Sequence, residues 1–231
     1  MKKIFYIPGI IFALAVVVFA LLQSLSAVVY GGMDFYRQEF IKHDVAAAVD
    51  MEVEDVVRVM EHTLEYMRGN EDELQVETVI GGEPAYFYNE REIMHMADVR
   101  VLTLAGYQAR AIALAVALGC LAVLIAGRVR WGRLLSRSFL VASVILLAFI
   151  GFIAICALKD FNSFWTAFHG VFFTNDLWLF DPAESRMINI MPEGFFYDIV
   201  TRFALIFGIF ITAVLAASII GTVVTRRRKH R

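Results

Sequence analysis

The chain has 231 residues, 59% of them hydrophobic, and its mean hydropathy of +0.66 excludes an ordinary soluble domain. Hydropathy this high comes from segments of roughly 20 apolar residues, each long enough to cross a lipid bilayer. Both cysteines, Cys120 and Cys156, lie within such segments, so a disulfide framework is not expected.

Four apolar segments have the length of transmembrane helices, and they lie at 4–29, 105–126, 139–158 and 203–224. The first is longer than the apolar part of a cleaved signal peptide, which is about 7–15 residues, so we expect it to be retained. The composition therefore predicts a multi-pass membrane protein with four transmembrane helices.

Charge is distributed unevenly between the loops that connect these segments. Eleven of the 21 basic residues lie at the N-terminus, in the middle loop and in the C-terminal tail, without any acidic residue, whereas all 23 acidic residues lie between Asp34 and Asp198. Short cytoplasmic loops collect Lys and Arg, so the basic ends are better explained as topology signals than as nucleic-acid sites. We therefore expect both termini to be cytoplasmic. In this topology residues 1–3, 127–138 and 225–231 are cytoplasmic, and residues 30–104 and 159–202 are extracytoplasmic.

The first outer loop contains a clear helical pattern, preceded by a mixed segment, 34–49, that is expected to be interfacial or partly helical. Gly69 and Asn70 mark the end of the patterned helix. Its apolar residues follow helical spacing and form one stripe, made of Val53, Val56, Val57, Met60, Leu64 and Met67. We expect this stripe to pack onto the rest of the outer loops.

A β-hairpin is predicted after that helix. Residues 74–80 alternate as a strand does, Gly81-Gly82 suits a two-residue turn, and residues 85–88 supply the second strand. Two further extended pieces are expected at 178–180 and 187–191, on either side of a turn at Asp181-Pro182. Together these elements predict a small extracytoplasmic α/β cap built from the two outer loops. The cap segments alternate with the spans, so we expect a single membrane domain, 1–231.

Two histidines have neighbours that favour a functional site. His95 and Asp98 are three residues apart on a helix that is expected to begin outside the membrane and continue into the second span, so they share a face. His169 follows Trp165 by four residues within an aromatic-rich segment, 161–173. The remaining histidines are expected to be structural, and they are His43, His62 and His230.

Three segments resemble one known family. The sequence FHGVFFTNDLWLFDPAESRMINIMPEGFF, 168–196, resembles the signature of a Gram-positive family of four-helix membrane proteins that contains the lipoprotein intramolecular transacylase, Lit. The segment EREIMHMADVRVL, 90–102, resembles its second signature, which centres on H-x-x-D-V. The helix VEDVVRVMEHTLEYMRGNEDEL, 53–74, is similar to the first outer helix of that family. With the four-span topology, the resemblance covers most of the chain.

The resemblance implies an acyltransferase of the cell membrane whose active site faces the outer leaflet. Its substrate would be a lipoprotein with a diacylglyceryl N-terminal cysteine and a free α-amine. The enzyme would move the sn-2 acyl chain from glycerol to that amine and leave a lyso-form lipoprotein. The two functional histidines of the family correspond to His95 and His169. Neither a metal nor another cofactor is implied, and the partners are the diacylated lipoprotein and membrane lipid, with no nucleic acid.

This chemistry suits two histidines. Transfer of an acyl group from ester to amide needs an unprotonated amine, a path for the proton and stabilisation of an oxyanion. Because donor and acceptor belong to one molecule, no Ser or Cys nucleophile is required. Histidine moves protons near neutral pH. We expect one histidine to take the ammonium proton, and the other to orient the substrate or protonate the departing glycerol oxygen; we favour His169 as the base.

Neighbouring residues are candidates for orienting the histidines or the substrate. Asp98 can orient His95, and Asn175 or Asp176 can orient His169 or bind the ammonium group. Arg110 is better explained as an anchor at the outer interface than as a ligand of a carbonyl or oxyanion. Trp178 belongs to an aromatic cluster that favours anchoring and core packing, with an acyl pocket as the alternative. The cluster comprises Phe168, Phe172, Phe173, Trp178 and Phe180.

Two other function classes remain open on the residues alone. A metal-dependent membrane hydrolase would use His95, His169, Asp98 and Asp176 as ligands, although no H-E-x-x-H spacing supports it, and a chelator would abolish its activity. A non-enzymatic membrane adaptor would bind a partner through its acidic outer loops, and both histidines would then tolerate alanine.

Overall fold

The structure, a computed structural model of the chain, describes residues 5–127, 139, 144, 147–148, 151–153 and 155–227. These residues are mainly helical, and the chain divides into two compact units. The membrane unit comprises Met1–Leu25, Tyr107–Lys159 and Phe203–Arg231, and the polar unit comprises Ser26–Gly106 and Asp160–Arg202. The polar unit thus covers nearly the same residues as the two outer loops expected from the sequence.

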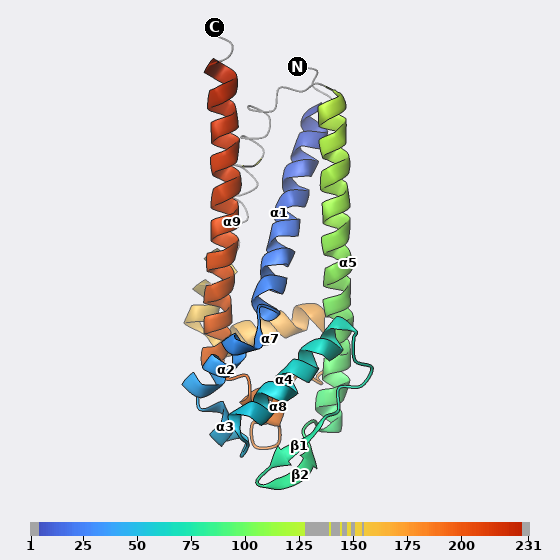
Figure 1. The fold of residues 1–231 in the computed structure, drawn as a ribbon, viewed down its shortest axis with the longest axis vertical. Coiled ribbons are helices and arrows are strands. Elements are labelled where there is room, and N and C mark those ends of the chain that lie inside the picture. Colours follow the sequence, from blue (N-terminus) through green and yellow to red (C-terminus); the bar gives the residue numbers. More distant parts are fainter. Residues whose placement is uncertain are drawn as a thin grey trace. The chain divides into compact units, whose positions relative to one another are not determined.

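Three helices of the described residues are long and apolar enough to cross a membrane. They are α1 (Tyr6–Val29), α5 (Glu90–Ala126) and α9 (Glu193–Arg227), of which Glu193–Ala217 forms the candidate span. In the membrane unit these helices run alongside one another, and α1 runs in the opposite direction to α5 and α9 (Figure 1). The expected third span, 139–158, is described only in part, and the loop 128–138 lies outside the described residues entirely.

Small side chains allow the helices of the membrane unit to approach closely. Ala13, Val17 and Ala20 of α1 are buried against Phe207 and Ile211 of α9. Without a hydrophobic driving force between helices in lipid, such contacts rely on van der Waals packing, which small residues permit. A separate cluster, Leu124 with Phe5 and Phe12, joins α5 to α1.

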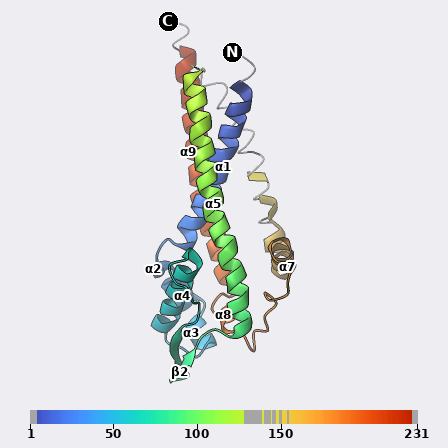
Figure 2. The ribbon, with the colours of Figure 1, turned by 90° about the vertical axis from the view of Figure 1, so that its right-hand side faces the viewer.

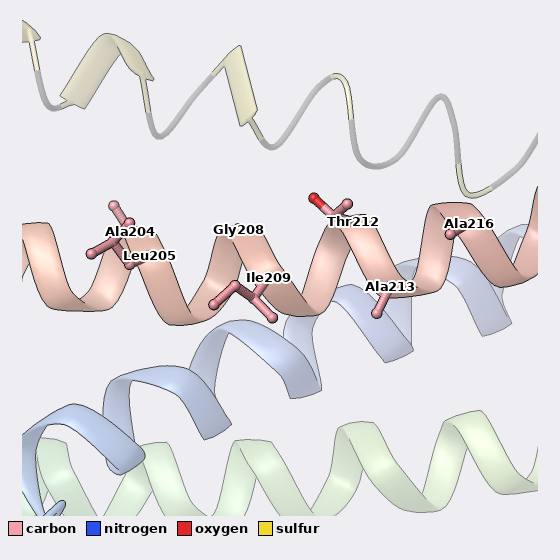
Figure 3. Close-up of a pocket in the computed structure, with 7 residues that line it drawn as sticks. All are labelled: Ala204, Leu205, Gly208, Ile209, Thr212, Ala213 and Ala216. Atoms are coloured by element: carbon pink, nitrogen blue, oxygen red, sulfur yellow. The ribbon is translucent and has the colours of Figure 1, made fainter.

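A shallow hollow of about 550 Å³ follows one face of α9 (Figure 3). Small residues recur there at every fourth position, at Ala204, Gly208, Thr212 and Ala216. The described residues that line the hollow all belong to α9, and we assign it no ligand.

Helix α5 changes character along its length. Five of its first eleven residues, Glu90 to Arg100, are charged, whereas residues 101–126 contain one charged side chain, Arg110. The charged part belongs to the first segment of the polar unit, Ser26–Gly106. Only the apolar part of the helix that follows is suited to the membrane interior. The expected helix that begins outside the apolar region and continues into it is therefore confirmed.

The core of the polar unit is built around α4 (Val53–Arg68), with α2 (Met33–Lys42) and α3 (Val45–Ala48) beside it. The predicted stripe is confirmed, because its four central residues are buried and its two end residues are partly buried against the same core. Gly69 ends α4 in the left-handed conformation, with φ 85°, which glycine adopts without strain.

The predicted hairpin is present, with a first strand that is shorter than expected and a second strand that begins two residues earlier. Strand β1 (Glu77–Ile80) pairs antiparallel with β2 (Glu83–Tyr86), and Gly81-Gly82 forms the two-residue turn. Both glycines have positive φ, 61° and 84°, as a turn of type I′ requires. Thr78 is buried on the face that the alternation predicted.

The prediction of two further extended pieces, at 178–180 and 187–191, was wrong. Residues 187–191 fall in a helical turn, α8 (Arg186–Asn189), because the Ser185 side chain accepts a hydrogen bond from the backbone N–H of Ile188 and caps this turn. Residues 178–180 form no strand, and Leu179 closes a turn onto the Asp176 carbonyl at 3.1 Å. The turn at Asp181-Pro182 is confirmed. The described part of the polar unit therefore contains one two-stranded sheet.

Helix α7 (Phe161–Phe172) completes the polar unit. Asp160 caps it by accepting a hydrogen bond from the Ser163 N–H at 3.0 Å. The first turns of α5 lie between α2–α4 on one side and α7 on the other (Figure 2). Helices α2–α4 and helix α7, which are distant in the sequence, therefore lie on opposite sides of the beginning of α5.

Candidate active site

The two histidines singled out from the sequence meet in the polar unit. His95 lies on the second turn of α5 and His169 lies near the end of α7, and their ring centroids are 5.9 Å apart. Both residues are buried, with 5% and 4% of their surface exposed. Seventy-four residues of sequence separate them, so the fold, and not local structure, brings the rings together.

Aromatic rings surround the pair. Trp178 stacks on His169 with 4.7 Å between centroids, and Phe173 and Phe180 meet the ring of His95 edge-on at 5.1 and 5.5 Å. The expected aromatic cluster therefore divides into two groups. Phe173, Trp178 and Phe180 line the histidine pair, whereas Phe168 and Phe172 are 39% and 48% exposed on α7, although the ring of Phe168 also meets His169 edge-on at 5.5 Å.

A backbone carbonyl fixes the orientation and tautomer of His169. Its Nδ1 lies 2.8 Å from the carbonyl oxygen of Trp165, one helical turn earlier. A carbonyl can only accept, so Nδ1 carries the hydrogen and Nε2 of the neutral ring keeps its lone pair. Burial lowers the pKa of His169, and the carbonyl opposes this shift. His169 is therefore neutral at physiological pH, with Nε2 able to accept a proton.

His95 is also held in the neutral form. Burial is the main cause that lowers its pKa to about 4, the proximity of His169 lowers it further, and Asp98 acts in the opposite direction. Its buried Nδ1 makes no hydrogen bond with any residue that the structure describes. A buried nitrogen without a partner is costly, so this atom is suited to a hydrogen bond with substrate.

The expected orienting residues form a different network. The amide of Asn175 donates to Asp98 at 2.9 Å, and the indole N–H of Trp178 donates to the Asn175 carbonyl at 2.9 Å. Arg91 donates to the backbone carbonyl of Asp176. These contacts hold the segment that follows α7 against α5. His169 is hydrogen-bonded to Trp165 in this structure, and the alternative role of Asn175 or Asp176, binding of the ammonium group, stays a prediction.

Glu92 is a functional candidate that sequence reasoning missed. Its side chain is fully buried one turn before His95, and its carboxylate accepts hydrogen bonds from the Ser185 hydroxyl at 2.6 Å and from the Met187 N–H at 3.0 Å. The other oxygen accepts from the Asn89 N–H at 2.8 Å, and Asn89 accepts in return from the Glu92 N–H. This reciprocal pair is a capping box, so the pattern Asn-x-x-Glu was the available signal. Glu92 thereby ties α5 to the loop that carries Phe180.

Arg110 belongs to the membrane unit. It donates to the side-chain oxygen of Gln23 at 3.2 Å, and its guanidinium lies 5.0 Å from the centre of the Tyr107 ring. Both contacts are with helix residues of the same unit, and the anchoring role favoured from the sequence stays a prediction.

The other histidines have varied surroundings. His62 is bonded to the Glu73 carbonyl at 2.9 Å, which fits a structural role, and His230 lies outside the described residues. His43 lies beside two carboxylates, Glu39 and Asp198. Within the described ranges, the side chains close enough together to hold a metal ion are those three, and not the pair His95 and His169 with Asp98 or Asp176.

Comparison with known proteins finds solved structures with a similar fold. No curated protein sequence matches the chain. The solved structure of the membrane integral lipoprotein intramolecular transacylase Lit from Bacillus cereus is similar, with a TM-score of 0.74, 17% sequence identity, and coverage of 98% of this chain and 96% of that one. A variant of the same protein with a histidine replaced by alanine gives a TM-score of 0.68 at 17% identity, with coverage of 97% and 93%.

The apolar helices and the matched fold define a mainly helical integral membrane protein. Residues 10–196 match the family model of the lipoprotein intramolecular transacylase Lit. This span is most of the chain, which therefore belongs to the Lit family and is an acyltransferase of lipoproteins.

Proposed function

We propose that this enzyme moves the sn-2 acyl chain of a diacylglyceryl lipoprotein to the α-amine of its N-terminal cysteine, with His95 and His169 moving the protons. The observation that carries the proposal is the pair of buried, neutral imidazoles 5.9 Å apart: Nε2 of His169 keeps its lone pair, and Nδ1 of His95 has no hydrogen bond with any described residue. Two proton-transfer groups at this spacing can serve one amine and one leaving oxygen.

In the first step the amine nitrogen attacks the carbonyl carbon of the sn-2 ester. A C–N bond forms, the carbonyl oxygen becomes an oxyanion, and Nε2 of His169 takes a proton from the nitrogen. Nucleophile and ester share one molecule, so the protein has to orient them and does not have to supply a covalent nucleophile.

In the second step the C–O bond to glycerol breaks. The departing oxygen receives the proton that the nitrogen gave up, and the oxyanion collapses to the amide carbonyl. No proton is gained or lost overall. His95 orients the substrate or delivers this proton, and its Nδ1 supplies the group for either role. Exposed aromatic residues of α7 would keep the site at the lipid surface, where the acyl chains lie.

The test is mass spectrometry of lipoprotein N-terminal peptides from cells that lack the gene and express single variants. His169→Ala and His95→Ala should each reduce the lyso form by at least about 100-fold, the lower range for loss of a proton-transfer group. His62→Ala is the matched control, because that histidine has a structural bond only, and it should leave the product unchanged. Normal lyso-lipoprotein in the His169→Ala strain would overturn the proposal.

We also propose that the membrane unit contains four spans, with both termini in the cytoplasm and the polar unit facing the outer leaflet as a cap. The exclusion of acidic residues from the termini and the middle loop supports this orientation. A cysteine introduced at exposed Glu83, the first residue of β2, should react with an impermeant thiol reagent in intact cells. A lack of reaction until the cells are lysed would reverse the orientation.

A further inference from the structure

A second cluster of ionisable side chains lies in the polar unit, at Glu39, Lys42 and His43 of the α2 region and Asp198 of α9. His43 Nε2 is 2.9 Å from Asp198 Oδ2 and 3.4 Å from Glu39 Oε2. One donor atom from each of Glu39, His43 and Asp198 lies within 4.8 Å of the other two. The acyl-transfer step proposed above uses none of these residues.

One oxygen of this cluster lacks the hydrogen bond that burial normally requires. Glu39 is 9% exposed, and its Oε2 is buried without a hydrogen bond to any described residue, although it faces His43. A buried carboxylate oxygen next to a second carboxylate is a position where a cation is favourable.

The backbone holds the imidazole in place. A Cβ at Gly194 would come within 2.4 Å of Cε1 and 2.9 Å of Nδ1 of His43, so the ring lies directly on the first turn of α9. Nε2 of the same ring is 3.3 Å from this Cβ position and also lies beside the two carboxylates. Glycine at 194 is needed for this approach, whatever the ring binds.

We propose that Glu39, His43 and Asp198 form a binding site for a divalent transition-metal ion, with Zn²⁺ preferred. Zn²⁺ binds imidazole nitrogen and carboxylate oxygen at about 2.0–2.2 Å, so donors around one ion are roughly 3–3.5 Å apart. The separation of His43 Nε2 from Glu39 Oε2, 3.4 Å, lies within this range, and its separation from Asp198 Oδ2, 2.9 Å, is slightly shorter. An imidazole ligand favours Zn²⁺ over Ca²⁺ and Mg²⁺, which prefer oxygen ligands alone.

The Lys42 ammonium would compete with a metal ion for the carboxylates of this site. The ammonium contacts Asp198 and lies 3.6 Å from Glu39 Oε2, so it neutralises part of the negative charge. The Lys42 side chain is 53% exposed and can turn into solvent when an ion enters. Metal binding should therefore strengthen when this positive charge is removed.

The experiment is calorimetric titration of the full-length, metal-stripped protein in detergent with ZnCl₂, MnCl₂ and CaCl₂. We expect one saturable Zn²⁺ site, weaker Mn²⁺ binding and no Ca²⁺ binding. His43→Gln and Asp198→Asn should weaken Zn²⁺ binding by at least about tenfold. His62→Gln is the control for histidine loss and should bind normally. Lys42→Met should bind Zn²⁺ more tightly than the natural protein.

A glycine pair tests the site without removing a ligand, in case the other variants fail to fold. Gly194→Ala pushes a methyl group into His43 and should weaken Zn²⁺ binding, whereas Gly208→Ala on the same helix meets no atom within 4 Å and should not. Absence of saturable Zn²⁺ binding, with Lys42→Met only lowering the unfolding temperature, would show an internal ion-pair network and overturn the proposal. Loss of binding in His95→Gln but not in His43→Gln would place the ion at the histidine pair and overturn it equally.

Discussion

The two units of this protein are stabilised by different kinds of contact. In the described part of the membrane unit, the buried polar side chain is Ser24, and the clusters consist of apolar residues. The polar unit buries polar or charged side chains throughout its core. They are Glu39, Thr63, Thr78, Glu92, His95, His169 and Ser185. Apolar helices of sufficient length are enough to build the membrane unit, whereas the polar unit depends on specific hydrogen-bond partners for its buried polar side chains.

This difference predicts how the units respond to substitution. A buried polar group that loses its partner pays the full desolvation penalty, about 1–3 kcal/mol for each group. An apolar side chain that faces lipid loses only packing when it is shortened. Substitutions in the polar unit should therefore have large, specific effects, and matched substitutions in the membrane unit should have small ones.

Replacement of Glu92 should give the largest effect. Glu92→Ala leaves the Ser185 hydroxyl and the backbone N–H groups of Met187 and Asn89 without their acceptor. We expect a loss of at least about 3 kcal/mol in the free energy of unfolding. Lyso-lipoprotein formation should fall as well, because the loop that carries Phe180 is no longer tied to α5. Thermal unfolding in detergent and peptide mass spectrometry measure the two effects.

Glu90→Ala is the control for Glu92→Ala. Glu90 is exposed on the same turn of α5, so its loss should change stability by no more than about 0.5 kcal/mol. Equal effects of the two substitutions would mean that the Glu92 network contributes little. The contrast between the units would then fail at its strongest point.

The second prediction concerns acid stability. Both histidines are neutral in the folded protein because burial lowers their pKa, to about 4 for His95, whereas an unfolded histidine has a pKa near 6.5. Between these values the unfolded chain binds more protons, so stability falls as the pH falls. The contribution is fully present above about pH 6.5 and should decrease by roughly 1–2 kcal/mol toward pH 4.5.

Carboxylates also titrate in this window, so the measurement is the difference between two unfolding series. The double variant His95→Gln, His169→Gln should show a shallower loss of stability between pH 6.5 and 4.5 than the natural protein. His62→Gln should follow the natural protein. Parallel curves for the double variant and the natural protein would contradict the neutral, buried state of the pair.

Sequence patterns predicted the elements whose contacts are local. The stripe of α4 is periodic within one helix, and the Gly81-Gly82 turn depends on two adjacent residues, so both were confirmed. The spacing of His169 from Trp165 placed both on one face of α7, although the role of the Trp165 carbonyl could not be read from side-chain identity. Local patterns of this kind therefore predicted the stripe of α4, the hairpin turn and the shared helix face of Trp165 and His169.

Contacts between distant residues could not be predicted in this way. Glu92 looks like an acidic residue in the first turn of a helix, and its partner Ser185 is 93 residues away. The same contact explains why residues 187–191 form a helical turn and not the expected extended piece, since Ser185 caps α8. His43 lies 155 residues from Asp198, and nothing near either residue in the sequence signals their contact.

The third prediction compares two glycines of the polar unit. Gly69→Ala places a side chain at φ 85°, which should cost about 1 kcal/mol, although the new Cβ meets only ordinary contacts. Gly106→Ala lies within α5, meets no atom within 4 Å, and should be neutral or stabilising by up to about 1 kcal/mol. Thermal unfolding of both variants tests the pair. A cost for Gly106→Ala equal to that for Gly69→Ala would show that backbone conformation is not the cause.

The smallest effect is expected in the membrane unit, at its two cysteines. Cys120 and Cys156 are both free and half-buried, and neither has a described polar partner to lose. Cys120→Ala, Cys156→Ala and the double variant should each change the free energy of unfolding by less than about 0.5 kcal/mol and leave lyso-lipoprotein formation unchanged. A larger loss of activity than of stability would reveal a thiol that acts in the reaction. Unchanged activity would instead show that this unit requires apolar volume where the polar unit requires particular atoms.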